Sequence, residues 1–272
     1  MHHDALKVRE LWSAGRVSHG PFVQMNAPGE VEIFAHAGHT HVVIDLEHGA
    51  INLETAENMM RAAHATGIVP FARVLANQPE LITQALNIGA AGILVPHVDS
   101  AEEARAAVSA MRFGPEGTRG VCPFVRSASY AADNGPAYYS GANSAVIAGV
   151  LLEGREAYDE LDDFLAIDDL DLLLVAPYDL SQSLGVTGDV YHEKVVAMVR
   201  MVCDRAGEAG KNVGIFAEDA ERAADWVVHG ARFVCTDVDS QILLRAAREQ
   251  VDGFARALAA RTDRTTDEEK AC

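Results

Sequence analysis

Five side chains capable of acid–base or charge-stabilising chemistry stand at or just after the ends of apolar segments in this sequence. They are Asp45, His48, Arg73, Glu153 and Asp179. Paired carboxylates hold divalent cations such as Mg²⁺ and Mn²⁺, histidine transfers protons near neutral pH, and arginine binds anionic oxygens through two parallel hydrogen bonds. A site that gathers all five could bind a cation and stabilise negative charge developing on an oxygen.

Glu153 and Asp179 are the candidate metal ligands. Glu153 ends the segment VIAGVLLE, where a carboxylate without a partner would carry a desolvation cost of several kcal/mol. A bound cation would offset this cost, and a structural ion pair is the alternative. Asp179 precedes LSQSLG, so it could instead be the N-cap of a helix. Two carboxylates on neighbouring strand ends, with room for water, would suit Mg²⁺ or Mn²⁺.

Asp45, His48 and Arg73 are the candidate catalytic residues. His48 stands three residues after Asp45 in a loop that leaves an apolar segment, and this spacing lets the carboxylate orient the imidazole. The alternative is an exposed loop histidine. Arg73 ends its apolar segment and could bind a substrate carboxylate or form a salt bridge to a nearby acid. We interpret His97, which follows another apolar segment, as a structural residue.

Eight short apolar segments would position these side chains. They are rich in Val, Ile and Leu with little polar alternation, which is typical of parallel strands buried on both faces. They are GPFVQM (20–25), HVVIDL (41–46), IVPFARV (68–74), AGILVP (91–96), VIAGVLLE (146–153), LDLLLVAP (170–177), NVGIFA (212–217) and ARFVCTDV (231–238).

Helical patterns separate these strands. The segment 53–67 follows Asn52, a good N-cap, and ends at a glycine. Ser100 and Glu103 predict a capping box at the start of a later helix. Further helices are predicted over 192–210, 219–230 and 239–261. The stretch 113–145 lacks periodicity, and we interpret it as an excursion over the barrel with a short helix around 135–142.

Alternating strands and helices in a chain of 272 residues predict one (β/α)₈ barrel over residues 1–262. A doubly wound open sheet is the rival, but the G-x-G-x-x-G and G-x-x-x-x-G-K-[ST] signatures of its nucleotide-binding members are missing. Residues 263–272 are polar and predict a disordered tail. Because barrel active sites lie at the carboxyl ends of the strands, we expect the five side chains to meet at that rim.

Composition excludes several classes of protein. The formal net charge of −18 disfavours nucleic acid as a partner, because nucleic-acid binders need a basic face. The amino-terminal segment lacks the apolar region of a signal peptide, and no apolar run would span a bilayer. Cys122, Cys203, Cys235 and Cys272 show no C-x-x-C spacing, so we expect reduced thiols, no zinc site and a cytoplasmic location.

The segments VVIDLEHGA (42–50), ILVPHVDSAEEAR (93–105) and PYDLSQSLG (177–185) together resemble the metal-dependent 2-oxo-acid aldolases of the HpcH/HpaI family. The resemblance runs in order from about residue 15 to 250. Its most specific parts are the D-x-E-H, ILVPHVDSAEEAR and P-x-D-L-S-x-S-L-G segments. The motif-bearing segments are VVIDLEHGA (42–50), PFARV (70–74), GAAGILVPHVDSAEEARAAVSAMRFGPEGTRGV (89–121), LLEGREAYDELDDFLAIDDLDLLLVAPYDLSQSLG (151–185) and GKNVGIF (210–216).

The resemblance implies a (β/α)₈ barrel that forms a homohexamer, a trimer of dimers, with the last helix exchanged between subunits. It implies a divalent metal at Glu153 and Asp179, with Mg²⁺ or Mn²⁺ as first candidates and Co²⁺ as a further one. A pyruvate-like 2-oxo acid would bind the metal through its carboxylate and oxo oxygens.

The resemblance also implies roles for the other residues. Arg73 would contact the oxo and enolate oxygen. His48, supported by Asp45, would act as acid and base through a metal-bound water. Backbone groups of Ala176 and Pro177 would line the substrate carboxylate. The partners would be small molecules, a 2-oxo acid and an aldehyde, with no nucleic acid and no membrane.

The chain departs from the family pattern in the half of the site that would receive the aldehyde. Asn87 stands where an acid is usual, an acid expected to bind the acceptor at a subunit interface, and asparagine cannot carry its negative charge. Leu151 replaces a common Gln, Ala176 a Gly and Gly154 a Thr. These departures leave open a specialised condensation in place of a catabolic cleavage.

The sequence therefore predicts a metal-dependent aldolase, a carbon–carbon lyase that joins or separates a 2-oxo acid enolate and an aldehyde. The alternative is a biosynthetic synthase on the same scaffold that uses oxaloacetate or an acyl thioester. A regulatory protein that has lost catalysis is disfavoured, because the metal-binding and catalytic side chains are all present.

Overall fold

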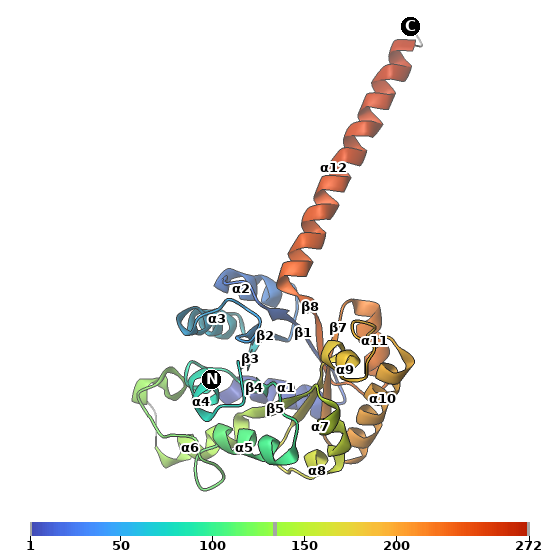
Figure 1. Cartoon of the computed structure of the whole chain (residues 1–272). Coiled ribbons are helices and arrows are strands. Elements are labelled where there is room, and N and C mark those ends of the chain that lie inside the picture. Colours follow the sequence, from blue (N-terminus) through green and yellow to red (C-terminus); the bar gives the residue numbers. More distant parts are fainter. Residues whose placement is uncertain (1, 133–134, 271–272) are drawn as a thin grey trace.

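The computed structural model of the chain is a closed barrel of parallel strands, and it describes residues 2–132 and 135–270 (Figure 1). Neighbouring strands pair in sequence order, and the last pairs with the first. The strands are β1 (Ser18–Val23), β2 (His41–Asp45), β3 (Val69–Arg73), β4 (Gly92–Val95), β5 (Ile147–Leu152), β6 (Leu172–Val175), β7 (Asn212–Ala217) and β8 (Phe233–Val238). The predicted (β/α)₈ barrel is confirmed, and each strand overlaps a predicted segment, although β1 begins at Ser18, before its segment 20–25.

Helices connect the strands and cover the outside of the barrel. They are α1 (His2–Ser13), α2 (Pro28–His36), α3 (Leu53–Thr66), α4 (Pro79–Asn87), α5 (Ala101–Met111), the 3₁₀ helix η1 (Arg126–Ala131), α6 (Pro136–Ala145), α7 (Arg155–Asp159), α8 (Leu161–Leu165), α9 (Pro177–Ser183), α10 (Glu193–Glu208), α11 (Ala220–Val228) and α12 (Asp239–Lys270). The predicted caps are confirmed: Asn52 accepts a hydrogen bond from the Thr55 amide at 2.8 Å, and Ser100 and Glu103 form the capping box.

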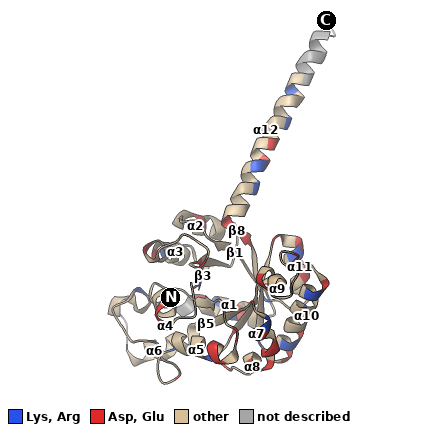
Figure 2. Cartoon of the chain, viewed as in Figure 1, with Lys and Arg blue, Asp and Glu red and all other residues tan. Residues whose placement is uncertain are grey.

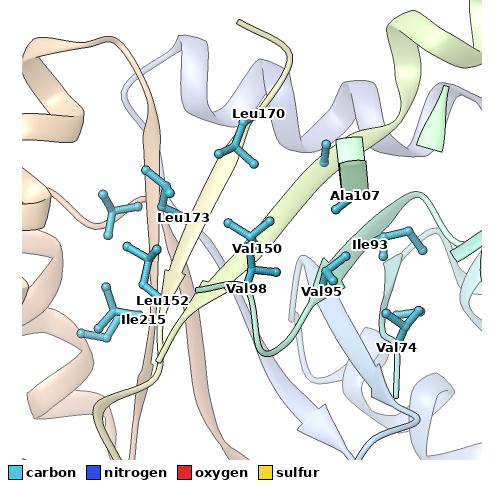
Figure 3. Packing of buried hydrophobic residues seen from close by; sticks show 14 of the residues in the cluster. Val74, Ile93, Val95, Val98, Ala107, Val150, Leu152, Leu170, Leu173 and Ile215 are labelled. Carbon is cyan, nitrogen blue, oxygen red and sulfur yellow. The ribbon is translucent and has the colours of Figure 1, made fainter. Parts of the chain in front are cut away.

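Two apolar layers hold the barrel together. Aliphatic side chains such as Ile93, Val150 and Leu173 fill the space between the strands and the surrounding helices (Figure 3). A second layer fills the interior of the barrel, where Phe71 and Phe233 are fully buried. Gly92 makes room for this layer, since a Cβ at its position would lie 2.4 Å from a ring carbon of Phe71.

A stack of aromatic rings fills the amino-terminal end of the barrel. The His41 ring lies parallel to that of Phe233 with centroids 3.9 Å apart, and Phe71 meets Phe233 edge to face at 4.8 Å. His41 and Phe233 are the first residues of β2 and β8, which places this aromatic stack at the end of the barrel opposite the predicted site. Helix α1 contacts the same end, where Trp12 donates a hydrogen bond to the Arg232 carbonyl at 3.0 Å.

His19 and His39 form a cluster with His41, which is itself part of this stack. The His19 and His39 rings lie 4.8 Å apart, and burial lowers the pKa of His19, His39 and His41 below 6.5. The buried Nδ1 atoms of His39 and His41 have no hydrogen-bond partner in the described part of the chain. The folded chain therefore holds these imidazoles in their neutral form.

This histidine cluster should make stability fall in mild acid. Because the unfolded chain binds these protons first, stability should be full above about pH 6.5 and decline as pH falls toward the lowered folded-state values. We expect His39→Gln to flatten that decline, measured by urea unfolding at several pH values, by less than about 1.4 kcal/mol per pH unit, the limit for one proton. His36→Gln, an exposed histidine nearby on α2, is the control. Identical slopes in both variants would contradict the assignment.

Helix α12 extends far from the barrel (Figure 1). The sequence prediction ends this helix at residue 261, and the structure extends it. The helix continues to Lys270, because no glycine or proline interrupts the chain after Gly253; residues 271 and 272 lie outside the described residues. Charged residues of both signs occur along the coloured part of this helix (Figure 2).

Two further expectations concern membranes and thiols. Within the described residues, no helix combines the length and apolar character that crossing a bilayer requires. Cys122, Cys203 and Cys235 are free thiols, as predicted, and Cys272 lies outside the described residues.

Candidate active site

A cavity of about 510 Å³ lies at the carboxyl ends of the strands, the end at which the sequence predicts the site. It gathers five of the predicted site residues: His48, Arg73, Ala176, Pro177 and Asp179. The remaining lining residues are Phe22, Gln24, Leu151, Leu174, Val175, Tyr178, Phe216, Glu218, Asp237, Val238, Gln241 and Arg245.

Arg73 and Asp45 form a two-pronged ion pair in the cavity wall. The β2–β3 register places these two residues side by side, and the Arg73 Nε and Nη2 atoms lie 2.9 and 2.6 Å from the two carboxylate oxygens. Gln24 donates a further hydrogen bond to Asp45 at 2.8 Å. Burial alone would raise the pKa of Asp45, but the hydrogen bond and charge of Arg73 lower it. Asp45 is therefore a carboxylate that holds the guanidinium in place.

His48 stands in the loop after β2, exposed, and lines the cavity. The structure differs from the expectation that Asp45 orients its imidazole. Asp45 Oδ1 instead accepts hydrogen bonds from the backbone amides of Glu47 and His48, at 3.1 and 3.3 Å. Asp45 thus shapes the loop that carries His48, because its oxygens are already engaged by Arg73 and Gln24.

Glu153 follows β5 and is buried. Burial, together with the charges of Asp179 and Glu47, raises its pKa to about 7. His97 lies against it, with Nδ1 3.0 Å from Glu153 Oε2. Glu153 thus has a partner for an ion pair, the alternative to metal binding, and that partner is His97, which the sequence analysis interpreted as a structural residue. His97 adopts a left-handed backbone conformation with φ of 54°, which no sequence pattern indicated.

Glu47 is a site residue that sequence reasoning missed, although it stands between Asp45 and His48 in the same motif. Its Oε1 atom lies 2.9 Å from His97 Nε2, so the ring of His97 bridges Glu47 and Glu153. Its Oε2 atom lies 3.2 Å from Arg73 Nε but is buried without a hydrogen bond in the described part of the chain.

Asp179 lies in the first turn of α9, exposed at the cavity, while Ala176 occupies the N-cap position. The alternative of a helix-capping role for Asp179 is therefore wrong. Its charge acts on Glu153, which places both carboxylates in one electrostatic environment.

The donor set fits a hard divalent cation. Glu153 is buried near two further acids, and Glu47 carries an unsatisfied oxygen, so the site holds negative charge that a cation would neutralise. Among the described residues, no group of three or more His, Cys, Asp or Glu side chains is arranged to hold an ion. Carboxylate oxygens are donors that hard divalent cations prefer.

The residues that depart from the family pattern lie in different places. Leu151 and Ala176 line the cavity. Gly154 approaches Asp99 closely, since a Cβ there would lie 2.6 Å from Asp99 Oδ1. Asn87 ends α4, near the amino-terminal end of the barrel, where it accepts a hydrogen bond from Arg119 at 3.0 Å. The structure does not bring Asn87 together with the other predicted site residues.

Polar residues from β7, β8 and α12 form the opposite side of the cavity, and sequence reasoning did not select them. Glu218 follows β7, and Asp237 lies near the end of β8. Asp237 pairs with Arg245, while Glu218 accepts a hydrogen bond from the Tyr178 hydroxyl at 2.7 Å. These acids also stand at the ends of apolar segments, so the rule that selected Glu153 would have selected them.

Comparisons with known proteins point to one family. Residues 19–246 match the family described as HpcH/HpaI aldolase/citrate lyase. The chain is 34% identical to a hydroxypyruvate/pyruvate aldolase of Rhizorhabdus wittichii, over 93% of this chain and 99% of that protein. It is 35% identical to a 4-hydroxy-2-oxo-heptane-1,7-dioate aldolase of Klebsiella pneumoniae, over 96% of each.

Solved structures show the same likeness. An HpcH/HpaI aldolase/citrate lyase family protein from Burkholderia cenocepacia J2315 superposes with a TM-score of 0.87 at 30% identity, covering 92% of this chain and 99% of that one. The citrate synthase SbnG superposes with a TM-score of 0.83 at 28% identity, covering 92% and 97%.

Proposed function

The chain belongs to the HpcH/HpaI aldolase/citrate lyase family and is a carbon–carbon lyase, and on that premise we propose the following roles for its residues. The substrate is a pyruvate-like 2-oxo acid joined to an aldehyde. Glu153 and Asp179 hold a divalent cation, Mg²⁺ or Mn²⁺ with Co²⁺ as a further candidate. The observation that carries the proposal is the convergence of His48, Arg73 and Asp179 on one cavity beside the buried Glu153.

The residues of the chain divide the work between binding and proton transfer. The cation, when bound, supplies Lewis-acid stabilisation of negative charge on the 2-oxo acid oxygens. Arg73, fixed by Asp45, adds a guanidinium aimed at the oxo oxygen where the enolate charge develops. His48 accepts the proton of the aldol hydroxyl as the carbon–carbon bond breaks, and the bonding electron pair remains on the enolate. Backbone groups of Ala176 and Pro177 orient the carboxylate.

Chelation tests this proposal. Pyruvate release from a 4-hydroxy-2-oxo acid, followed by a coupled assay, is expected to fall at least about 100-fold after treatment with EDTA and removal of the chelator, because several kcal/mol of charge stabilisation are lost. Adding back Mg²⁺, Mn²⁺ or Co²⁺ is expected to restore the rate. Full activity in the chelated protein would contradict the metal assignment.

A biosynthetic synthase is the second candidate, favoured by the likeness to the citrate synthase SbnG. Such an enzyme would form a product from oxaloacetate or an acyl thioester and would show no pyruvate release. The aldolase has the better support, because the curated relatives at 34 and 35% identity are aldolases.

We also propose that helix α12 docks on further copies of the chain, within a homohexamer built as a trimer of dimers. Apolar residues at spacings of three and four along α12 are exposed, with exposed fractions of 69% for Val251, 71% for Phe254 and 54% for Leu258. Helix exchange between subunits would cover them. Asn87 is remote from the cavity of its own chain. In such an assembly it would contact the aldehyde bound in the cavity of a neighbouring subunit.

The mass in solution tests the assembly. Sedimentation velocity of the unchanged chain is expected to give six subunits, and Phe254→Glu is expected to yield smaller species, because a charge would be buried in the interface. Phe124→Glu, an equally exposed phenylalanine on the loop before η1, is the control. A monomer at micromolar concentration would contradict the proposal.

A further inference from the structure

The cavity has two chemically different ends. Arg73, at the end of β3, has a side chain that is only 11% exposed, whereas the side chain of Arg245 on α12 is 51% exposed. In an eight-stranded barrel β7 lies across from β3, so Glu218 faces the Arg73 side from the opposite wall. The end near Arg73 is deep and takes the 2-oxo acid. The end near Glu218, Asp237, Gln241 and Arg245 lies closer to the mouth.

We propose that Glu218, Asp237 and Gln241 select an uncharged, hydroxylated aldehyde as the acceptor and disfavour aldehydes that carry a carboxylate. This inference rests on the proposed function, since it names the class of the second substrate of the same site. Three features of the wall carry it: a fixed carboxylate, a second carboxylate that neutralises the nearby arginine, and the amide of Gln241.

Two phenols fix the carboxylate of Glu218. The Tyr178 hydroxyl donates to Oε1 at 2.7 Å, and the Tyr191 hydroxyl donates to Oε2. Burial and the contact with Glu218 raise the pKa of Tyr178 to about 12, so this phenol remains a donor at neutral pH. Each carboxylate oxygen can accept a second hydrogen bond, which leaves Glu218 an oriented acceptor for a substrate hydroxyl.

Asp237 is held as firmly. Its side chain is 5% exposed, Oδ1 accepts the Val238 amide at 2.8 Å, and Oδ2 pairs with Arg245. Its φ of 64° lies in the left-handed region, which aspartate tolerates better than most residues. The acid thus stands at a position where few side chains other than Asp or Asn would fit without strain.

The charges on the wall disfavour a second carboxylate in the substrate. Both guanidinium groups that line the cavity already face acids, Arg73 with Asp45 and Arg245 with Asp237. A carboxylate on the aldehyde would approach Glu218 and Asp237 across the cavity from Arg73 and with Arg245 already paired, and like charges at short range repel strongly in a partly enclosed site. Hydroxyl groups would donate to the same oxygens and to the Gln241 amide oxygen.

Competition among three aldehydes tests the inference. Condensation of pyruvate with D-glyceraldehyde, propanal and succinic semialdehyde compares a hydroxylated, an apolar and an anionic acceptor. We expect kcat/KM for D-glyceraldehyde to exceed the values for the other two by about tenfold or more. A preference for succinic semialdehyde in the unchanged chain overturns the inference.

Variants that remove charge separate the effect of these side chains on acceptor preference from the intrinsic reactivity of each aldehyde. Glu218→Gln is expected to raise the ratio of kcat/KM for succinic semialdehyde to that for D-glyceraldehyde by about tenfold. Asp237→Asn, which keeps the side-chain shape and releases Arg245, is expected to raise it further. Glu221→Gln, an exposed acid on α11, makes the same charge change outside the cavity and is the matched control. Ratios that change no more in the two wall variants than in the control overturn the inference.

Exchange of the pyruvate methyl protons with deuterated water, observed by NMR, separates this inference from the proposed function. Exchange with no preference for the hydroxylated aldehyde refutes the acceptor assignment alone. Absence of exchange in the metal-loaded chain refutes the proposed function, and the acceptor assignment with it.

Discussion

Glu153→Gln is expected to weaken Mn²⁺ binding at least about 100-fold and to lower the rate of 2-oxo acid cleavage by about 10³-fold or more, since the charge stabilisation contributed by a cation amounts to several kcal/mol. Isothermal titration with Mn²⁺ and the pyruvate-release assay measure the two effects. Asp179→Asn is expected to behave in the same way. The two variants should lose binding and activity together.

The physical reason is the loss of charge at nearly constant shape. Glutamine keeps the volume of the buried side chain but cannot supply a carboxylate ligand. Burial and neighbouring acids already oppose the charge on Glu153, so its removal is expected to leave the thermal unfolding temperature unchanged or higher. Glu156→Gln, exposed on α7, is the control. Normal Mn²⁺ affinity in Glu153→Gln would refute the metal-ligand assignment.

Arg73→Lys is expected to lower kcat/KM by about 10²-fold to 10³-fold while Mn²⁺ binding persists, the usual effect of losing one preorganised donor to an oxyanion. Lysine keeps the positive charge but lacks the planar guanidinium. The guanidinium of Arg73 binds both oxygens of Asp45 and has further N–H groups for the cavity that it lines. Arg105→Lys, exposed on α5, is the control. Unchanged kcat/KM in Arg73→Lys would remove Arg73 from the mechanism.

The expected effect of Arg73→Ala is different. Breaking a buried ion pair typically costs about 3–5 kcal/mol, because one charge remains buried without a partner. Asp45 is fully buried, so Arg73→Ala is expected to lower the unfolding temperature as well as the activity. The lysine variant therefore separates the loss of the donor from the loss of the fold.

Sequence patterns were sufficient to predict the barrel and to identify the strand ends that carry the candidate site. Buried parallel strands read as apolar runs, and the barrel brings their carboxyl ends to one rim, so Arg73 and Asp179 could be placed together without coordinates. A salt bridge of Arg73 to a nearby acid was one of two predicted alternatives, but the identity of its partner, Asp45, depends on the β2–β3 register. The contact of His97 with Glu153 depends on a left-handed backbone conformation that the chain does not signal at that position.

Glu218 and Asp237 were not predicted as site residues, although they stand at the ends of apolar segments as Glu153 does. The predicted helix ends at residue 261, whereas α12 runs to Lys270, and the segment beyond residue 261 contains no glycine or proline that would end it earlier.

The packed rings of His41, Phe71 and Phe233 have a consequence for the order in which substrates bind and products leave. They fill the amino-terminal end of the barrel, and the cavity lies at the opposite, carboxyl end. In the proposed mechanism the 2-oxo acid binds beside the less exposed Arg73 and lies deeper than the aldehyde near Arg245. On that placement the aldehyde would leave before the 2-oxo acid after cleavage, and in condensation the 2-oxo acid would bind first.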